Sequence, residues 1–389
     1  MMEFEYWWLM ALPLFFALGW LAARVDINQL LSESSILPAA YFKGLNFLIS
    51  DQHDKAIEAF IEAVEANADS LELHFALGSL FRRRGEVDRA IHLHLNLLER
   101  KEIADPQKLA VMAELAQDYL KAGLFDRAEE LFRSLDQTPR YQLPALRALQ
   151  EIYVREREWE RAIETARELE KVSIVSMRKE IAQYYCELAV KYQHANDTRS
   201  ARQQLELALE SNKNCVRANA MLGDMEEAAG AHENAIAMWK RIELQQPQYL
   251  GLIALRMLKS YKALGKTPQG LAQMESYLKK YNLPSLLNVV YEAVLAEQGA
   301  AAAAQLARKE LSHQPSLQLL DQFLQAQTEA GNGDPQDTQL MRHTIRTFLG
   351  SHSAYLCEQC GFRARHYHWQ CPACNNWESF PPESNELNP

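Results

Sequence analysis

The sequence lacks the excess of basic residues that a nucleic-acid-binding protein needs. Its 389 residues include 41 Lys and Arg against 51 Asp and Glu, which gives a formal net charge of −10. Because binding to phosphate groups depends on clustered Lys and Arg, we do not expect nucleic acid as a partner. The chain also lacks a nucleophile and a base at a spacing typical of a catalytic site, so we do not expect an enzyme.

Cysteine is scarce, and most of it is concentrated near the C-terminus. Of the six cysteines, Cys186 and Cys215 occur singly inside helical patterns, where a small buried thiol packs well. The other four form two CxxC pairs with ten residues between them. Paired CxxC units point to a metal ion in a reducing compartment more than to disulfide bonds.

The two CxxC pairs predict one four-thiolate metal site. A tight CxxC turn lets both of its thiolates face one ion, and four sulfurs in a tetrahedron suit Zn²⁺, with iron as the alternative. The ligands are Cys357, Cys360, Cys371 and Cys374. A closed shell of four thiolates leaves no position for water, so we expect a structural site and not a hydrolytic one.

The segment around these cysteines is too small to have a core of its own. Metal binding would therefore supply much of its folding free energy. We expect a small metal ribbon at residues 351–381 and a disordered tail at 382–389. His366 and His368 lie between the pairs and could compete as ligands, but we expect two exposed rings. The remaining aromatic residues, Tyr367, Trp369 and Trp377, would let the ribbon pack on the rest of the protein.

Residues 6–23 contain no charged side chain. Eighteen helical residues span roughly 27 Å, which is close to the hydrocarbon thickness of a bilayer. A cleaved signal peptide is the alternative, but the leading residues include Glu3 and Glu5 instead of a basic region. We predict a single transmembrane anchor at 1–25 and a polar linker at 26–40. Arg24 follows the run and no Lys or Arg precedes it, so the bulk of the chain is expected in the cytoplasm.

The middle of the chain repeats with a period close to 34 residues, which is typical of stacked helix pairs. The first marker position recurs at intervals of 34, 38, 34, 39, 34 and 35 residues: Gly44, Gly78, Ala116, Gln150, Ala189, Gly223 and Leu258. A small residue follows each marker after twelve residues, and an aromatic residue follows after three residues in every repeat except the one with Glu226. This is the tetratricopeptide pattern, and we predict a superhelical array over residues 41–350.

Beyond Tyr281 the pattern is weaker. Ala303, Leu306 and Pro315 suit one more helix pair, and residues 319–349 suit capping helices separated by a GNGDP loop. Such arrays present a concave surface that binds a peptide, a helix or another domain, so binding is the expected function. Five basic residues would project toward this groove, although a merely solvated face is an equal alternative. They are Arg82, Arg83, Lys121, Arg147 and Arg155. His92 and His94 are two residues apart, too close for a helical metal pair, and are expected at the surface or in the groove.

The combination of anchor, array and ribbon resembles the lipopolysaccharide assembly protein B family of Gram-negative bacteria. The segments that carry the resemblance are GLNFL from Gly44, LFRRRGEVDRAI at 80–91, AGLFDRAE at 122–129, YCELA at 185–189, CxxCGF at 357–362 and HWxCPxC at 368–374. The resemblance implies an all-α tetratricopeptide-repeat superhelix with an N-terminal transmembrane helix and a small C-terminal rubredoxin-like zinc ribbon. It also implies that the four cysteines of the two CxxC pairs are the metal ligands.

The resemblance further implies an adaptor on the cytoplasmic face of the inner membrane. Such an adaptor would link a membrane AAA+ protease to the deacetylase of the committed lipid A step, and would help to coordinate other lipopolysaccharide assembly proteins. Asn375 departs from the glycine that rubredoxins have after the second CxxC pair, which puts electron transfer in doubt. Two other functions are alternatives to the adaptor: a rubredoxin-like iron redox protein and a generic tetratricopeptide scaffold for envelope complexes. A homodimer, formed with a second copy of the chain, is a further interaction to be considered.

Overall fold

The computed structural model describes most of the chain between the N-terminal segment and the tail. The described residues are 13, 16, 17, 20, 39–100, 103–313, 315–331, 335–351 and 355–382. The expected anchor, the linker up to residue 38 and the tail from residue 383 therefore lie outside the described ranges, apart from those four N-terminal residues. Within the described ranges, no helix combines the length and the apolar character that crossing a bilayer requires.

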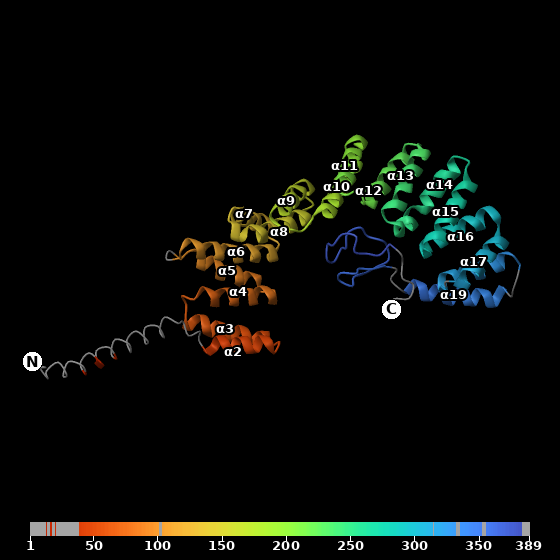
Figure 1. The fold of residues 1–389 in the computed structure, drawn as a ribbon. Coiled ribbons are helices and arrows are strands. Elements are labelled where there is room, and N and C mark those ends of the chain that lie inside the picture. Colours follow the sequence, from red (N-terminus) through yellow and green to blue (C-terminus); the bar gives the residue numbers. More distant parts are fainter. Residues whose placement is uncertain are drawn as a thin grey trace, which may run out of the picture. The chain divides into compact units, whose positions relative to one another are not determined.

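Eighteen α-helices follow one another along the described part of the chain (Figure 1). They are α2 (Ala39–Ile49), α3 (His53–Ala66), α4 (Leu71–Arg84), α5 (Val87–Leu98), α6 (Asp105–Ala122), α7 (Phe125–Leu135), α8 (Pro139–Glu156), α9 (Trp159–Val172), α10 (Arg178–His194), α11 (Thr198–Ser211), α12 (Val216–Ala228), α13 (His232–Gln245), α14 (Leu250–Ala263), α15 (Thr267–Tyr281), α16 (Pro284–Gln298), α17 (Ala300–His313), α18 (Leu317–Glu329) and α19 (Pro335–Ser351). A single 3₁₀ turn, η1 (Pro247–Tyr249), precedes α14. The chain divides into two compact units, Met1–Ile152 and Tyr153–Pro389.

The helices pack in consecutive pairs, as the repeat predicts. Where the marker residue of the first helix is glycine, it faces the ring of the residue sixteen positions later in the second helix. A Cβ atom added to Gly44 would lie 2.7 Å from the ring of Phe60. One added to Gly223 would lie 2.2 Å from Nε1 of Trp239. With the helices in these positions, a side chain larger than glycine at Gly44 or Gly223 would clash with the ring.

The residue types at these two positions differ from repeat to repeat. Glycine markers precede the rings of Phe60, His94 and Trp239, whereas the marker Ala189 precedes Leu205. These later side chains are all buried. A smaller side chain at one position thus leaves room for a larger one at the other, as close packing requires.

The turn between the two helices of a pair needs a left-handed backbone. Gly85 ends α4 with φ 88° and Gly123 ends α6 with φ 76°. In the related REWERA segment, Arg157 adopts φ 58° at the corresponding place. Two GxxDRA turns therefore use glycine for a conformation that other residues rarely adopt, and the third accepts some backbone strain.

Of the aromatic residues predicted to fill the gaps between helices, four are buried and lie under a cation: Phe81, Tyr119, Tyr153 and Tyr261. Phe47 and Tyr192 are only half-buried. The guanidinium of Arg89 lies 4.1 Å from the ring centroid of Phe81, and that of Arg161 lies 4.2 Å from the ring centroid of Tyr153. The exception in the sequence pattern, Glu226, instead accepts a hydrogen bond of 2.5 Å from Arg202. An ion pair thus replaces the cation–π contact in that repeat.

The last helices close the second unit, as expected for residues 319–349. Helix α18 ends at Glu329 and α19 begins at Pro335. Asp321 of α18 accepts hydrogen bonds from Arg342 (2.9 Å) and Arg346 (3.0 Å) of α19. The hydroxyl of Tyr291 in α16 donates to the backbone oxygen of Gln322 at 2.6 Å.

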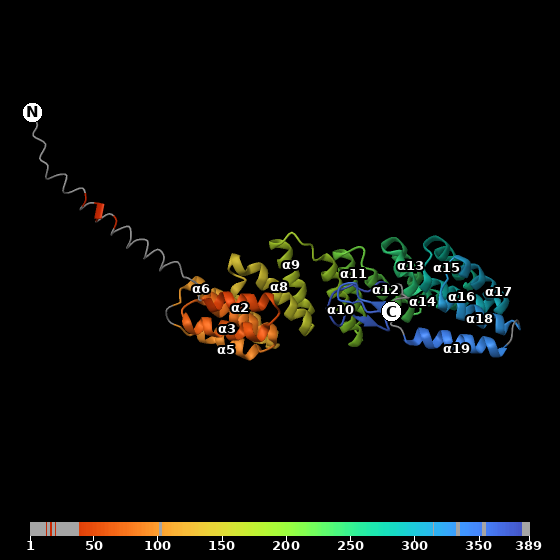
Figure 2. The same cartoon turned by 90° about the horizontal axis from the view of Figure 1, so that it is seen from below.

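After α19 the chain returns to the helices at the start of the second unit. Two short strands, β1 (Tyr355–Leu356) and β2 (Arg363–Ala364), pair antiparallel and begin the ribbon. In Figures 1 and 2 the ribbon, drawn in dark blue, lies beside α10 and α12, on the inner side of the arc that the helices of this unit form. The C-terminal ribbon is therefore packed inside its own helical array.

Candidate metal centre and its docking surface

Each CxxC pair closes a turn of the same backbone design. The N–H of Gly361 donates to the carbonyl of Cys357 at 2.9 Å, and the N–H of Asn375 donates to the carbonyl of Cys371 at 2.9 Å. Both closing residues have a left-handed backbone, with φ 73° at Gly361 and φ 58° at Asn375. Asparagine is, after glycine, among the residues that best tolerate this conformation. The asparagine therefore leaves the turn intact and gives no ground for choosing between zinc and iron.

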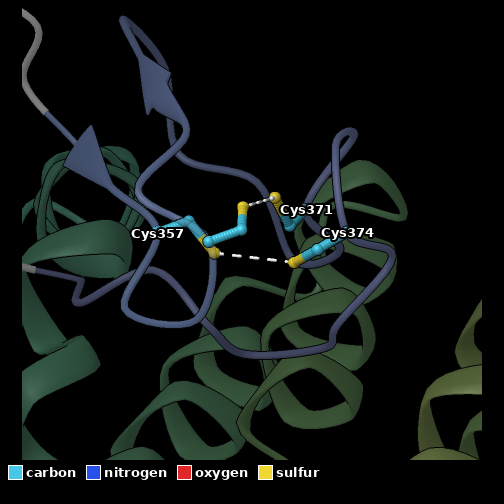
Figure 3. A group of neighbouring side chains, drawn as sticks. Cys357, Cys371 and Cys374 are labelled. Atoms are coloured by element: carbon cyan, nitrogen blue, oxygen red, sulfur yellow. Dashed lines mark hydrogen bonds between the residues drawn. The ribbon is translucent and has the colours of Figure 1, made fainter. Parts of the chain in front are cut away.

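The two turns bring all four predicted ligands together. Their sulfur atoms lie within 4.8 Å of one another. The Sγ atoms of Cys357 and Cys374 are 3.7 Å apart, as are those of Cys360 and Cys371 (Figure 3). Four sulfurs at about 2.3 Å from a central ion would be separated by about 3.8 Å along the edges of a tetrahedron. The four-cysteine metal-binding site is therefore already arranged for a tetrahedral ion, and both zinc and iron fit it.

The thiols of Cys357 and Cys360 do not ionise independently of their neighbours. Burial alone would raise the pKa of Cys357, but hydrogen bonds with the Ser379 hydroxyl and with backbone N–H groups lower it to about 6. For Cys360, a backbone N–H bond from Phe362 lowers the pKa, whereas burial and the neighbouring thiols raise it to about 12. One thiolate thus forms readily, and the next resists ionisation beside it. A divalent cation between the sulfurs would remove this repulsion.

The site is closed on one side and open on the other. Cys357 and Cys371 are buried, whereas Cys360 is exposed. His366 and His368 are exposed, as predicted. Further polar groups approach the sulfurs from within the ribbon: Ser379 Oγ lies 3.3 Å from Cys357 Sγ, and Asn376 Nδ2 donates to Cys374 Sγ at 3.4 Å.

Three aromatic side chains hold the ribbon on the array, which confirms the prediction made for them. The ring of Trp369 stacks on that of Tyr249, with centroids 5.6 Å apart and planes at 7°. The ring of Tyr367 meets the same tyrosine edge to face at 6.2 Å. Trp377 makes edge-to-face contacts with Trp159 (6.3 Å) and Tyr184 (6.1 Å). The ribbon thus contacts α9, α10 and η1.

A polar contact lies between these aromatic anchors. Gln183 of α10 donates from Nε2 to Glu378 of the ribbon at 2.8 Å. Arg217 of α12 lies 5.7 Å from the ring centroid of Trp377 and donates to Glu187 at 2.7 Å. Burial at this interface raises the pKa of the Glu378 carboxyl, while Lys179 and the bond from Gln183 oppose the increase. The interface therefore contains a carboxyl group that is partly removed from water.

Comparison with known proteins agrees with this architecture. The family description rubredoxin metal binding domain matches residues 355–382, and the tetratricopeptide repeat matches residues 43–107 and 186–246. The lipopolysaccharide assembly protein B of Escherichia coli strain K12 is 32% identical in an alignment covering 95% of this chain and 96% of that protein. The protein of the same name from Haemophilus influenzae is 30% identical over 96% and 97% of the two chains. This chain belongs to the lipopolysaccharide assembly protein B family. The resemblance carried by the sequence motifs is thereby confirmed.

The five basic residues predicted for the groove differ in their surroundings. Arg82 donates to Glu114 at 2.7 Å and to Asp118 at 2.5 Å, so it ties α4 to α6. The other four side chains are exposed: Arg83, Lys121, Arg147 and Arg155. A role of this set in partner binding stays a prediction.

His94 is not at the surface or in the groove, so this expectation was wrong. Its side chain is fully buried at the helix crossing, where a Cβ on Gly78 would lie 2.4 Å from its ring. Its Nδ1 lies 2.5 Å from Oδ2 of Asp118, which is also fully buried. The glycine sixteen residues earlier is the sequence signal that could have placed this ring in the core.

Cys186 and Cys215 are buried, as predicted, but they do not occur singly. Their Sγ atoms lie 3.8 Å apart. Cys186 belongs to α10, whereas Cys215 is the residue that precedes α12 and so does not lie inside a helix. The ribbon contacts of Gln183 and Glu378 were also not foreseen, because they join residues 195 positions apart.

Proposed function

We propose that this chain is a non-catalytic adaptor in lipopolysaccharide assembly. The observation that supports this best is the docked ribbon. It adds to the helices α9, α10 and α12 of the array and so makes a composite surface whose shape depends on a structural metal site. Arrays of this kind present extended surfaces to protein partners. A closed shell of four thiolates supplies no open coordination position for hydrolytic chemistry.

The finer proposal follows the family resemblance. The adaptor is anchored by residues 1–25 in the inner membrane, with the array on the cytoplasmic side. It brings the lipid A pathway deacetylase to a membrane AAA+ protease and so limits lipopolysaccharide synthesis. The uncharged run at 6–23 supports the anchor, and the single Arg24 after it supports the orientation. The exposed Arg83, Lys121 and Arg147 are candidate contacts for an acidic partner segment.

The half-life of the deacetylase in cells tests the proposal. Depletion of this chain should lengthen that half-life, and expression of the intact chain should restore it. An unchanged half-life on depletion would rule out the proteolytic role. Deletion of residues 1–25 should release the chain from the membrane fraction and abolish restoration. If the deleted chain remains in the membrane fraction, the anchor assignment is wrong.

The metal site is tested by a double substitution, Cys357→Ser with Cys360→Ser. We expect loss of the metal and of restoration, with far-ultraviolet circular dichroism that still shows a helical array, since the helices have cores of their own. Phe362→Ala is the matched control, because Phe362 lies in the same turn and its side chain is exposed. Restoration by the double variant would show that the ribbon is dispensable.

Iron in the four-thiolate site would favour a redox function instead. The sulfur geometry accepts iron as well as zinc. Metal analysis of protein purified from its native membrane separates the two: a colourless zinc protein fits the adaptor. A red protein that bleaches on reduction would fit the redox alternative.

A further inference from the structure

A second pair of cysteines lies outside the metal site. Cys186 in α10 and Cys215 at the start of α12 have their Sγ atoms 3.8 Å apart, and both side chains are fully buried. Neither contributes to the four-sulfur cluster. Two thiols held this close by different helices need only a short movement to reach the length of a disulfide bond, about 2.05 Å.

The pair lies directly behind the surface on which the ribbon docks. Nε2 of Gln183 lies 3.9 Å from the sulfur of Cys215 and donates at 2.8 Å to Glu378 of the ribbon. Arg217 donates to Oε1 of the same glutamine at 3.3 Å and lies 5.7 Å from the ring centroid of Trp377. Two side chains therefore touch both the ribbon and the surroundings of the thiols. A movement of the ribbon therefore changes the contacts around the thiols, and a movement of the thiols changes the contacts with the ribbon.

The two thiols are chemically unequal. The hydrogen bond with Cys186 lowers the pKa of Cys215, and the backbone N–H of Ala218 in the first turn of α12 lowers it further, against the effect of burial. Burial raises the pKa of Cys186. A thiol at a helix N-terminus with a lowered pKa is the better nucleophile, and the neighbouring protonated thiol can resolve its oxidised form.

We propose that Cys186 and Cys215 form an oxidisable dithiol, which hydrogen peroxide converts to a disulfide and which the docked ribbon shields. The Cys215 thiolate attacks one peroxide oxygen, the O–O bond breaks, and the departing hydroxide takes a proton to leave as water. The sulfenic acid on Cys215 is then attacked by the sulfur of Cys186. This forms the S–S bond and releases a second water. Overall, two thiols are oxidised to one disulfide while one peroxide is reduced to two waters.

The shielding follows from burial. Because both sulfurs are fully covered, peroxide reaches them only when the ribbon leaves its docking surface or the helices open locally. Formation of the disulfide in turn pulls the start of α12 toward α10 and moves Arg217 and Gln183 away from their ribbon partners. Docking protects the reduced pair, and by linkage the oxidised pair weakens docking.

Peptide mapping of the full chain, loaded with zinc and treated with hydrogen peroxide, tests the proposal. After free thiols are blocked, digestion without reduction should yield a peptide that joins Cys186 to Cys215. Trp377→Ala removes a docking contact but no thiol and no metal ligand. It should speed formation of the joined peptide roughly tenfold or more, because the undocked state becomes more populated. Phe362→Ala, an exposed ribbon residue, should leave the rate unchanged.

Two single substitutions assign the roles of the sulfurs. In Cys186→Ser the sulfenic acid on Cys215 should accumulate and be trapped by dimedone, whereas in Cys215→Ser the remaining thiol should react far more slowly. Circular dichroism and zinc content confirm that each variant is folded. Absence of the joined peptide from both the wild-type chain and Trp377→Ala would overturn the proposal. A rate of formation that Trp377→Ala does not change would overturn the shielding by the ribbon.

Discussion

Replacement of Trp377 by alanine should release the ribbon from the array without emptying the metal site. The indole makes edge-to-face contacts with Trp159 and Tyr184 and receives the guanidinium of Arg217 at 5.7 Å. An aromatic pair contributes about 0.5–1.5 kcal/mol beyond burial, and a cation–π contact at a partly exposed site about 0.5–1 kcal/mol. The docked state should therefore lose about 1.5–4 kcal/mol, which raises the undocked population roughly 10- to 800-fold.

Amide hydrogen exchange measures this change directly. Peptides from α9, α10 and the ribbon should exchange faster in Trp377→Ala, while peptides from α4 and α5 in the first unit should not change. Zinc content should remain that of the unsubstituted chain, since the four ligands are kept. Phe362→Ala removes an exposed ring from the same ribbon and serves as the control. Equal exchange in the two variants would refute the view that these aromatic contacts hold the ribbon.

Three further predictions concern packing, pH and a buried ion pair. Gly223→Ala should lower the free energy of unfolding of the second unit by about 1–3 kcal/mol, since its Cβ would meet the Trp239 ring at 2.2 Å. Adding Trp239→Leu should restore part of that loss in thermal melts. Burial raises the pKa of Glu378 in the docked state. Docking should therefore be strongest at a pH below the pKa that this carboxyl has when the ribbon is undocked, and should weaken as the pH rises through the raised pKa of the docked state. In Glu378→Gln, hydrogen exchange of the ribbon should lose this dependence. Asp118→Ala should lower the free energy of unfolding in urea by about 3–5 kcal/mol, because it leaves buried polar groups without their partner. The substitution of an exposed residue, Arg83→Ala, should lower it by less than about 0.5 kcal/mol.

Each of these predictions has a result that contradicts it. A double variant less stable than the sum of its two single variants would argue against volume exchange at the helix crossing. Ribbon exchange with the same pH profile in the glutamine variant would assign the dependence to another group, of which Lys179, Glu180 and Arg217 are the nearest charges. Equal losses for the buried aspartate and the exposed arginine would show that the buried pair is not coupled to folding.

The array could be predicted because its pattern is local. Each helix pair repeats the same contacts within one period, so marker residues such as Gly44 and Gly223 report the crossing without knowledge of the rest of the chain. The metal site was predictable for the same reason, since each CxxC turn fixes two ligands by itself. Its closing residues also followed a local rule, because Gly361 and Asn375 are both residues that accept a left-handed backbone.

The docking surface could not be predicted in the same way. Gln183 and Glu378 are joined across 195 positions, and no spacing in the sequence relates them. The adjacency of Cys186 and Cys215 arises from the stacking of α10 on α12, that is, between repeats and not within one. The burial of His94 was not predicted, because the expectation rested on its spacing from His92 and not on Gly78, which leaves room for the ring. Local sequence patterns are therefore enough to predict the helices and the metal-binding turns. The docking surface depends on contacts between repeats, which local patterns do not contain.

The docking surface depends on the metal site through the second CxxC turn. Trp369 and Trp377 flank that turn, and the bridge between Gln370 and Trp377 holds the two indoles at a fixed separation. The N–H of Glu378 also donates to the carbonyl of Trp369 at 2.8 Å. Without a metal ion the turn has little else to keep its shape, so both aromatic anchors would lose their positions together. Loss of the metal should therefore remove the composite surface while the helices remain folded, and a structural ion would in this way control the proposed adaptor.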